Sequence, residues 1–591
     1  MNFRFKQIIG VLVMAALFLS GVPAQLNAPV HGASDSLFLN GFYAINSRSE
    51  SDVVDNLSSV SVGWARVAKD AQGKIRFATE GQKLGPADEY PEYGIPATVG
   101  EEARKLKQSS ARKYLSVFCA DANPKDELSV PLELLSLSDQ QLQEQVINPL
   151  VSFLTKNPAG INFQGVVIDF EGLREETPGS WATKNRFNRF LDLLKQRLGE
   201  RELLVCLTPN NVYNYCDGYD YVHIGQVADT VILMAHDYYH ATPGNPRPDI
   251  AATAPYYQVE DAVKKMINAG VPREKLLLAI ALNGIQWIPK AGGNLEVALP
   301  TLSRIEATLA GINGPVVECT PNEHRYLSTY EWGGQTYDYR TGYTKIKRWQ
   351  DGKLIESEIY YETARSLAEK VDLARSQQLK GISVWRLGLG NQEAWDALIT
   401  FCASSTGFYD LRNHWSRSEV EYLVSRGIVH GVSARFFNPE GQMTRAEFAT
   451  IISLALGLKE PAQSIKFKDV QQGDWFYQSV SRAASAGLVS GKTPNQFCPY
   501  DRITREEAAV LVMRALHYQG VPVSGNRVLV FADADEIARW AINEVQNATA
   551  AGIISGYGQG KDRLFKPKGN ITRAEGAVMI NRMLGLVEQE I

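Results

Sequence analysis

The chain has 591 residues, of which 45% are hydrophobic and 21% are charged, and its formal net charge is -4. This length exceeds what one hydrophobic core supports, so two or more domains are expected. The charge shows no excess of basic residues, which argues against nucleic acid as the main partner.

Residues 1–33 have the pattern of a secretory signal peptide and a short leader. Arg4 and Lys6 precede an apolar run from Ile8 to Leu19, and Val22-Pro23-Ala24 fits the small-residue cleavage pattern. The run is shorter than the ~20 residues of a membrane-spanning helix, and no later segment is long and apolar enough to span a bilayer. The pattern predicts export, and the mature chain must then be held at the cell surface by other means.

Short apolar strands alternate with helical stretches over residues 34–403. Eight strand–helix repeats in roughly 250 residues or more are typical of a (β/α)8 TIM barrel, an α/β fold. The extra length lies in residues 288–361, which predicts a small inserted α+β lobe beside the barrel. The eight expected strands are 38–44, 60–67, 114–119, 165–171, 203–209, 230–237, 276–282 and 381–385.

Strand 165–171 ends in two carboxylates. Because side chains alternate along a strand, Asp169 and Glu171 point into the barrel while the residues between them face the covering helices. They lie at the carboxyl end of the strand, where enzymes of this architecture keep their active sites. At ~3.3 Å per residue they are about 7 Å apart and should raise each other's proton affinity. The alternative interpretation is a solvated strand end without a function.

Two other strand ends gather polar and aromatic side chains. Met234, His236, Asp237 and Tyr238 lie at the end of the sixth strand, and Trp385 ends the eighth. An aromatic floor with two carboxylates suits a sugar ring, although a Trp at a strand end is more often part of the core. The sequence carries no metal-ligand cluster or cofactor motif beside this expected carbohydrate site.

These residues resemble glycoside hydrolase family 18, the chitinase-like family, over most of residues 38–402. The run Gly-Val-Val-Ile-Asp-Phe-Glu at 165–171 is similar to that family's strand-four signature, Asp-x-x-Asp-x-Asp-x-Glu, in the form of its spore-cortex hydrolase branch. The stretches 234–237 and 381–385 match two further motifs of the family.

The resemblance implies cleavage of β-1,4 bonds next to N-acetylglucosamine without a protein nucleophile, because the N-acetyl oxygen of the substrate attacks. Glu171 would be the general acid and then the base, and Asp169 would orient the acetamido group. No cofactor or metal is needed. The other implied site residues are Asp237 and Tyr238, which would hold the distorted ring, His236 beside them, and Met234 and Trp385 on the substrate.

Three positions depart from the family pattern. Gln164 and Val167 occupy the first two aspartate positions, so Asp169 lacks an inner carboxylate and is expected to stay ionised throughout the reaction. His236 stands where a tyrosine usually contacts the acetamido carbonyl, so we expect the pH profile to carry a histidine limb.

Six cysteines are scattered through the chain without metal-ligand spacing. One sequence does not fix whether any pair is bridged, and we expect no obligatory disulfide framework. They are Cys119, Cys206, Cys216, Cys319, Cys402 and Cys498.

The last third of the chain holds three copies of one pattern. Each copy has a Trp twelve positions before a Gly and continues to Thr-Arg-x-Glu and an apolar helix. We expect each unit to form a helix, a glycine-rich loop and a second helix, and the three to pack as one all-α module. The units are 406–460, 465–519 and 529–587, and their tryptophans are Trp415, Trp475 and Trp540.

The arginines of these motifs need a separate explanation. A capping box accounts for the Thr and the Glu of Thr-x-x-Glu. It does not account for Arg445, Arg505 and Arg573, because a cation in the first turn sits at the positive end of the helix dipole. An anion bound between the repeats would reverse that sign, and solvated arginines are the alternative.

From Phe408 to about Leu586 the repeats resemble the S-layer homology domain, which anchors exported proteins to Gram-positive cell walls. The resemblance implies a three-pronged helical bundle whose grooves hold an anionic secondary wall polysaccharide, with the three tryptophans and three arginines facing that ligand. The third unit departs slightly, since its loop between Gly556 and Thr572 is longer.

Together these patterns predict a secreted hydrolase at the cell surface of a Gram-positive-type bacterium. Peptidoglycan and chitin remain alternative substrates, and the spore-cortex-like signature favours peptidoglycan. A non-catalytic, lectin-like protein is the main rival, although such lectins usually lose the acid that Glu171 supplies here. A purely structural surface-layer subunit would leave the carboxylates unexplained.

Overall fold

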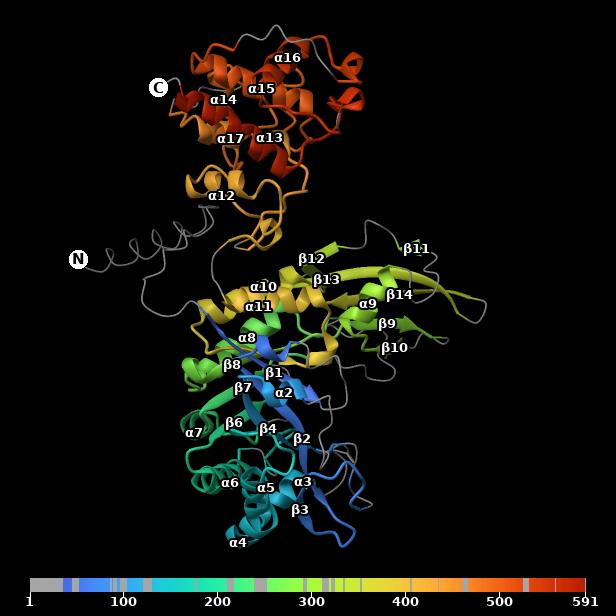
Figure 1. Ribbon diagram of the computed structural model, residues 1–591, viewed down its shortest axis with the longest axis vertical. Coiled ribbons are helices and arrows are strands. Elements are labelled where there is room, and N and C mark those ends of the chain that lie inside the picture. The colour runs from blue at the N-terminus through green and yellow to red at the C-terminus, as the bar shows by residue number, and fades with distance from the viewer. Residues whose placement is uncertain are drawn as a thin grey trace, which may run out of the picture. The chain divides into compact units, whose positions relative to one another are not determined.

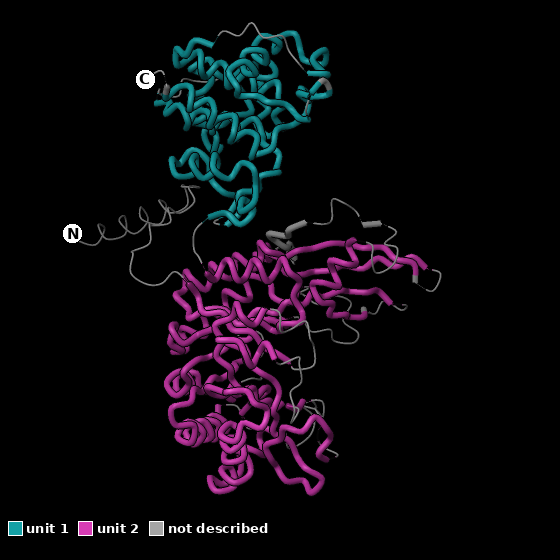
Figure 2. The backbone as a smooth tube through the Cα atoms, in the orientation of Figure 1, with its two compact units in different colours: residues 1–33, 406–591 teal, residues 34–405 magenta. Residues whose placement is uncertain are grey.

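The described residues of the computed structural model form two compact units, one ending at Ala403 and one beginning at Gly407 (Figure 2). The predicted signal peptide lies outside the described residues. The structure describes residues 36–44, 53–85, 88, 93–95, 104–120, 130–175, 177, 179–209, 217–238, 252–290, 295–310, 318–319, 325–332, 335–350, 353–403, 407–433, 435–459, 466–523, 531–558 and 560–589.

Eight parallel strands close into a barrel in the first unit (Figure 1). Closure is complete because β1 pairs with β2 on one side and with β15 on the other. The predicted TIM barrel is confirmed. Around the barrel the strands are β1 (Phe38–Ala44), β2 (Ser59–Lys69), β4 (Arg112–Cys119), β5 (Gly165–Phe170), β6 (Glu202–Leu207), β7 (Thr230–Met234), β8 (Leu276–Ala281) and β15 (Gly381–Trp385).

The strands form from near-continuous apolar runs because both of their faces are buried. Val167 of β5 and Leu204 of β6 belong to the cluster inside the barrel. Phe170 points the other way and stacks on Phe190 of α6 (Ala182–Leu198), with ring centroids 5.3 Å apart. This alternation confirms that the odd-numbered residues of β5 face inward.

Helices cover the outside of the barrel, and one short strand extends its sheet. β3 (Ile75–Ala78) pairs antiparallel with β2 and was not among the predicted strands. Besides α6, the helices of this unit are α2 (Arg104–Gln108), α3 (Val130–Ser136), α4 (Asp139–Leu142), α5 (Asn148–Lys156), α7 (Tyr221–Val227), α8 (Tyr256–Asn268), α10 (Ala364–Ser376) and α11 (Gln392–Ala403).

A six-stranded antiparallel sheet and one helix form the predicted inserted lobe (Figure 1). The lobe begins at Ile285, three residues before the expected boundary, because β9 directly follows the barrel strand β8. Trp287, Tyr339 and Tyr360 give it a small core of its own. Its elements are β9 (Ile285–Pro289), β10 (Leu295–Ala298), α9 (Leu302–Leu309), β11 (Glu318–Cys319), β12 (Arg325–Trp332), β13 (Gln335–Gln350) and β14 (Lys353–Tyr361).

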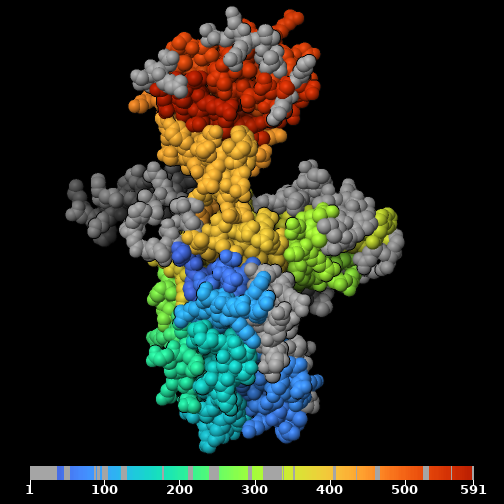
Figure 3. Space-filling model, in the orientation of Figure 1, coloured from blue at the N-terminus to red at the C-terminus, as the bar shows by residue number. Residues whose placement is uncertain are grey.

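The second unit repeats a helix, a loop and a helix three times around one shared hydrophobic core. The space-filling view shows its side chains as one continuous body (Figure 3). In the described part of the chain, we find no helix with the length and hydropathy needed to cross a membrane. The helices are α12 (Arg417–Ser425), α13 (Arg445–Ala455), α14 (Tyr477–Ser485), α15 (Arg505–Tyr518), α16 (Ile542–Ala550) and α17 (Arg573–Gln589).

Candidate active site and wall-binding grooves

Asp169 and Glu171 lie at the carboxyl end of β5, as predicted. Asp169 is only 2% exposed, and its Oδ1 atom has no hydrogen-bond partner among the described residues. The backbone N–H of Glu171 donates to the carbonyl of Cys119 on β4 over 2.9 Å, which fixes the start of the following loop. Gly172 then adopts a φ of +73°, a conformation that favours glycine, and the chain turns away from the strand.

Burial shifts the acidity of both carboxyl groups in the same direction. It raises the pKa of Asp169 well above its ordinary value, and the charge of Glu171 raises it further. It also raises the pKa of Glu171, against a smaller lowering effect of His236. The two groups titrate as a pair, and this pair keeps a proton to a higher pH than solvated carboxyl groups do.

The expectation that Asp169 stays ionised throughout stays a prediction. The missing inner carboxylate favours the ionised form, whereas burial in the barrel raises the pKa of Asp169 and opposes it. Two of the positions that depart from the family signature precede Asp169. Val167 is a buried core residue. Gln164 lies before the strand, and its Oε1 accepts a hydrogen bond from the N–H of Lys113 over 2.6 Å.

The segment after β7 brings a histidine and a carboxylate toward Glu171. His236 Nδ1 and Asp237 Oδ2 are 3.0 Å apart. The His236 side chain is 8% exposed, and its Nε2 is buried without a partner in the described part of the chain. Asp237 has a φ of +58°, and its charge opposes that of Glu171. His236, Asp237 and Glu171 therefore form one electrostatic group.

The contacts described for Tyr238 and Met234 are with other groups of the protein. Tyr238 is 2% exposed, and its hydroxyl donates to the carbonyl of Gln258 on α8 over 3.4 Å. Met234 ends β7 half-buried, against the apolar cluster inside the barrel. A direct role of either residue toward a substrate stays a prediction.

Trp385 ends β15 half-buried, within an aromatic cluster at the mouth of the barrel. Its ring lies 5.6 Å from that of Trp64 and 5.5 Å from that of Phe42, centroid to centroid. Trp64 also contacts Phe118 and Tyr93. The sequence analysis did not select Trp64, because a lone Trp inside an apolar strand carries no signal that separates a site residue from the core.

Among the described residues, Cys119, Cys206, Cys402 and Cys498 are outside any disulfide, and no cluster of three potential metal ligands occurs. Cys206 follows Val205, which pairs with Ile168 of β5, so it lies beside Asp169.

The repeat tryptophans lie on the surface of the second unit. Trp415 and Trp475 are each 59% exposed, and Trp540 is 58% exposed. An indole this exposed contributes little to the core, and its apolar ring is available to a ligand.

The repeat arginines have protein partners that sequence analysis did not identify. Arg445 donates through Nε to the carbonyl of Phe497 over 3.0 Å, through NH2 to that of Ser490 over 2.9 Å, and through NH1 to Glu507 over 2.8 Å. Glu507 is the capping glutamate of the next repeat. The negative charge that offsets the helix dipole is therefore supplied, at least for Arg445, within the protein.

The other two arginines repeat this contact and close a ring. Arg505 of the second repeat lies 3.0 Å from the capping Glu575 of the third, and Arg573 of the third lies 3.9 Å from the capping Glu447 of the first. Each arginine thus joins its repeat to the following one, and the third repeat joins back to the first. A role toward a wall ligand stays a prediction for all three.

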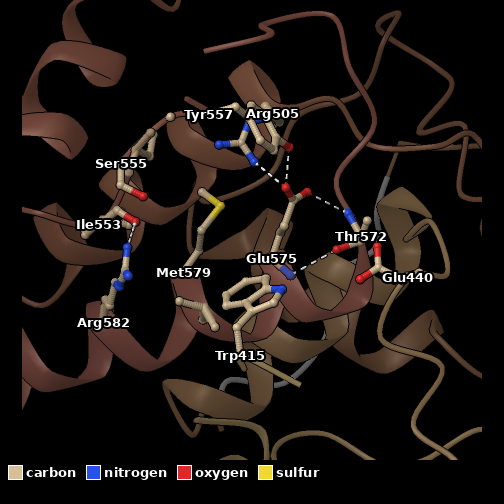
Figure 4. Close-up of a pocket in the computed structure, with 13 residues that line it drawn as sticks. Trp415, Glu440, Arg505, Ile553, Ser555, Tyr557, Thr572, Glu575, Met579 and Arg582 are labelled. Atoms are coloured by element: carbon tan, nitrogen blue, oxygen red, sulfur yellow. Dashed lines mark hydrogen bonds and ion pairs between the residues drawn. The ribbon is translucent and has the colours of Figure 1, made fainter. Parts of the chain in front are cut away.

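Two grooves form where these repeats meet. One, of about 320 Å³, brings together Trp415 of the first repeat, Arg505 of the second and Arg582 of the third. Figure 4 shows Arg505, Tyr557 and Thr572 around Glu575, with Trp415 and Arg582 also lining this groove.

The other groove, of about 300 Å³, has the same arrangement with different residues. It is lined by the first repeat's loop, by Trp475 of the second repeat and by Arg573 of the third. Leu454 occupies the helix position that Arg582 has in the first groove, so this groove is less cationic.

Comparison with known proteins identifies both units. Residues 122–390 match the family described as glycosyl hydrolases family 18, and residues 407–449, 466–509 and 530–577 match the S-layer homology domain. The chain combines a family 18 glycosyl hydrolase domain with three S-layer homology domains. A family 18 domain indicates a glycosidase, and S-layer homology domains indicate attachment at the cell surface.

Individual relatives share only part of their length with this protein. The amylopullulanase of Thermoanaerobacterium thermosulfurigenes is 35% identical over 211 residues, which are 34% of this chain and 11% of that protein. YdhD of Bacillus subtilis, a candidate sporulation-specific glycosylase, is 28% identical over 233 residues, 39% of this chain and 48% of that protein. This chain spans 11% to 18% of the first three curated relatives.

Among solved structures, the spore cortex-lytic enzyme SleL of Bacillus cereus has 19% identity and a TM-score of 0.46, covering 62% of this chain and 75% of its own. The chitinase of Chromobacterium violaceum has 20% identity and a TM-score of 0.45, covering 62% of this chain and 99% of its own.

Proposed function

We propose that this protein is a wall-anchored glycosidase that cleaves β-1,4 bonds next to N-acetylglucosamine by a substrate-assisted, retaining mechanism. The observation that carries the proposal is the placement of buried Asp169 and half-buried Glu171 at the carboxyl end of β5, near the aromatic cluster around Trp385. Burial raises the pKa of both carboxyl groups, and a raised pKa is what a general acid requires.

In the proposed reaction, Glu171 donates its proton to the oxygen of the scissile glycosidic bond. The acetamido oxygen of the sugar attacks its own anomeric carbon as that bond breaks, so a cyclic oxazolinium intermediate forms without a protein nucleophile. Glu171, now ionised, takes a proton from the water that opens the ring. The anomeric configuration is retained, and the enzyme returns to its starting protonation state.

Asp169 has a distinct proposed role toward the acetamido group. Its Oδ1 is buried and without a partner among the described residues, so it is an available acceptor for the acetamido N–H. An ionised Asp169 would also stabilise the positive charge of the oxazolinium. Asp169 is therefore proposed to orient and polarise the substrate.

His236 and Asp237 are proposed to hold the sugar ring from the side of β7. Their 3.0 Å contact fixes the imidazole, and the buried Nε2 has no partner in the described part of the chain. A His236→Phe variant that keeps the alkaline limb of the wild-type kcat/KM profile would exclude histidine from that limb.

The three repeats are proposed to hold the enzyme on the cell wall through an anionic polysaccharide. Exposed indoles at Trp415 and Trp475 suit sugar rings, and Arg582 adds a cation to one groove. An enzyme fixed to its own wall meets peptidoglycan first, which favours peptidoglycan over chitin as the proposed substrate.

The mechanism is tested with chitin oligosaccharides in which one sugar has lost its acetyl group. Because the acetamido oxygen is the proposed nucleophile, cleavage should occur next to acetylated sugars and should be absent next to the deacetylated one. Equal cleavage at both positions would contradict the substrate-assisted mechanism and would favour attack by a protein carboxylate.

A lectin-like binding protein is the second candidate. The presence of Glu171 argues against it, since a protein that only binds does not need a carboxyl group with a raised pKa at this position. Binding of the oligosaccharides without any cleavage would favour this candidate.

A further inference from the structure

One thiol lies against the buried carboxyl group of the candidate active site. β5 and β6 are parallel, with Ile168 opposite Val205, so the next inward pair in register is Asp169 and Cys206. Cys206 is 1% exposed and belongs to the cluster inside the barrel. Its thiol therefore lies beside the Asp169 carboxyl group on the inward face of the barrel.

The other neighbours of Asp169 offer it no such donor. β4 places the apolar ring of Phe118 opposite Asp169. Along β5 the nearest ionisable group is Glu171, and from β7 His236 and Asp237 act on Glu171. Of these neighbours among the described residues, the Cys206 thiol is therefore the side-chain group placed to donate to Asp169, whose Oδ1 has no hydrogen-bond partner there.

The proposed reaction requires the proton of the pair to be on a particular carboxyl group. Glu171 must hold it to act as an acid, and Asp169 must be ionised to stabilise the positive charge. Deep burial opposes this placement of the proton. Asp169 is the more buried of the two carboxyl groups, so ionising it costs more desolvation free energy than ionising Glu171. A donor to Asp169 alone favours the productive arrangement, since a hydrogen bond to the ionised form stabilises that form.

We propose that Cys206 is a positioning residue that keeps the shared proton on Glu171 by donating its S–H to ionised Asp169. The inference rests on the proposed function, because it concerns the same carboxyl pair. It also gives Asp169 a substitute for the inner carboxylate that Val167 replaces: the neighbouring strand supplies a thiol.

Three variants separate the hydrogen bond from the packing. Cys206→Val fills the space without a donor, Cys206→Ser keeps a donor, and Cys206→Ala opens a small cavity. We expect Cys206→Val to lower kcat by roughly three- to tenfold with little change in KM, the size of one weak charge-assisted hydrogen bond. The acid limb of its pH profile should move to higher pH, because Asp169 then takes the proton more readily. Cys206→Ser should restore both.

A second measurement does not depend on activity. The infrared S–H stretching band of Cys206 is isolated as the difference between the wild-type protein and Cys206→Val. A thiol that donates to a carboxylate absorbs at lower frequency than a free thiol, so the band should rise in an Asp169→Asn background. It should also shift with pH as the carboxyl pair titrates.

The two readouts distinguish failure of this inference from failure of the proposed function. A band that responds to Asp169→Asn in a protein without hydrolytic activity would support the thiol–carboxyl pair and contradict the proposed hydrolase. An active enzyme whose band ignores Asp169→Asn would overturn the inference. So would equal losses of kcat in Cys206→Val, Cys206→Ser and Cys206→Ala without a shifted acid limb, since that pattern indicates a purely structural role.

Discussion

Replacing Arg445 by methionine should destabilise the three-repeat unit strongly, whether or not a wall ligand is present. The Arg445 side chain is 7% exposed, and its partner Glu507 is 17% exposed. Methionine keeps an apolar stem in place but removes all three hydrogen bonds, including those to the carbonyls of Phe497 and Ser490. Glu507 would keep its capping contacts with Thr504 and lose its counter-charge.

The size of the effect follows from this burial. Removing one partner of a buried ion pair costs about 3–5 kcal/mol, because the remaining charge is uncompensated. For a unit of this size, each kcal/mol lowers the melting temperature by roughly 2–4 °C. For a loss of about 3 kcal/mol, the lower end of the energy range, we therefore expect the melting temperature to fall by about 6–12 °C.

The assay is differential scanning calorimetry of the full chain, in which the two units are expected to unfold in separate transitions. Arg66→Met, which breaks the buried pair with Asp88 in the barrel, should move the other transition and so assign the two. Arg417→Met is the matched control in the same unit, because its pair with Glu421 is exposed and contributes at most about 1 kcal/mol.

An Arg445→Met protein that melts within the range of Arg417→Met would refute this reasoning. Arg445 would then have no structural role. Binding of a wall ligand would be the remaining explanation for an arginine in the first helical turn.

Two further predictions concern the carboxyl pair and the grooves. Because burial raises the pKa of Asp169, the folded protein binds more protons than the unfolded chain above the ordinary aspartate pKa, and stability falls as pH rises through that window. Asp169→Asn should therefore melt at a higher temperature than the wild type at neutral pH and equally at pH 3; a difference that persists at pH 3 would contradict this assignment. Trp475→Ala should weaken sedimentation with purified wall polysaccharide by roughly tenfold, as loss of a Trp anchor does at an interface, while Trp349→Ala, equally exposed on the inserted lobe, should bind normally. Equal binding by both variants would remove the groove at Trp475 from the wall-binding surface.

The barrel could be predicted from sequence because its strands are buried on both faces and therefore stand out as apolar runs. Each of the eight expected strands overlaps a barrel strand, and the alternation along β5 correctly turned Asp169 inward. β3 has only four residues and lies beside the barrel instead of in it, so it lacked this signal.

What sequence analysis missed depends on contacts between distant segments. The pairing of Asp169 with Cys206 requires the register between β5 and β6, and the cluster of Trp64 with Trp385 requires closure of the barrel. The helix dipole indicates from sequence alone that the repeat arginines need an anion. Glu507 could not be identified as that anion, because it belongs to the following repeat and its sequence context already accounts for it as a helix cap.

The central claim is that Glu171 makes this protein a glycosidase, and product mass analysis tests it most directly. Wild type, Glu171→Gln and the surface control Glu144→Gln are incubated separately with chitin oligosaccharides and with purified peptidoglycan. We predict products that differ by whole N-acetylglucosamine-containing units from wild type and Glu144→Gln, with none from Glu171→Gln. Undiminished cleavage by Glu171→Gln, or no cleavage of either polymer by the wild type, would contradict the account.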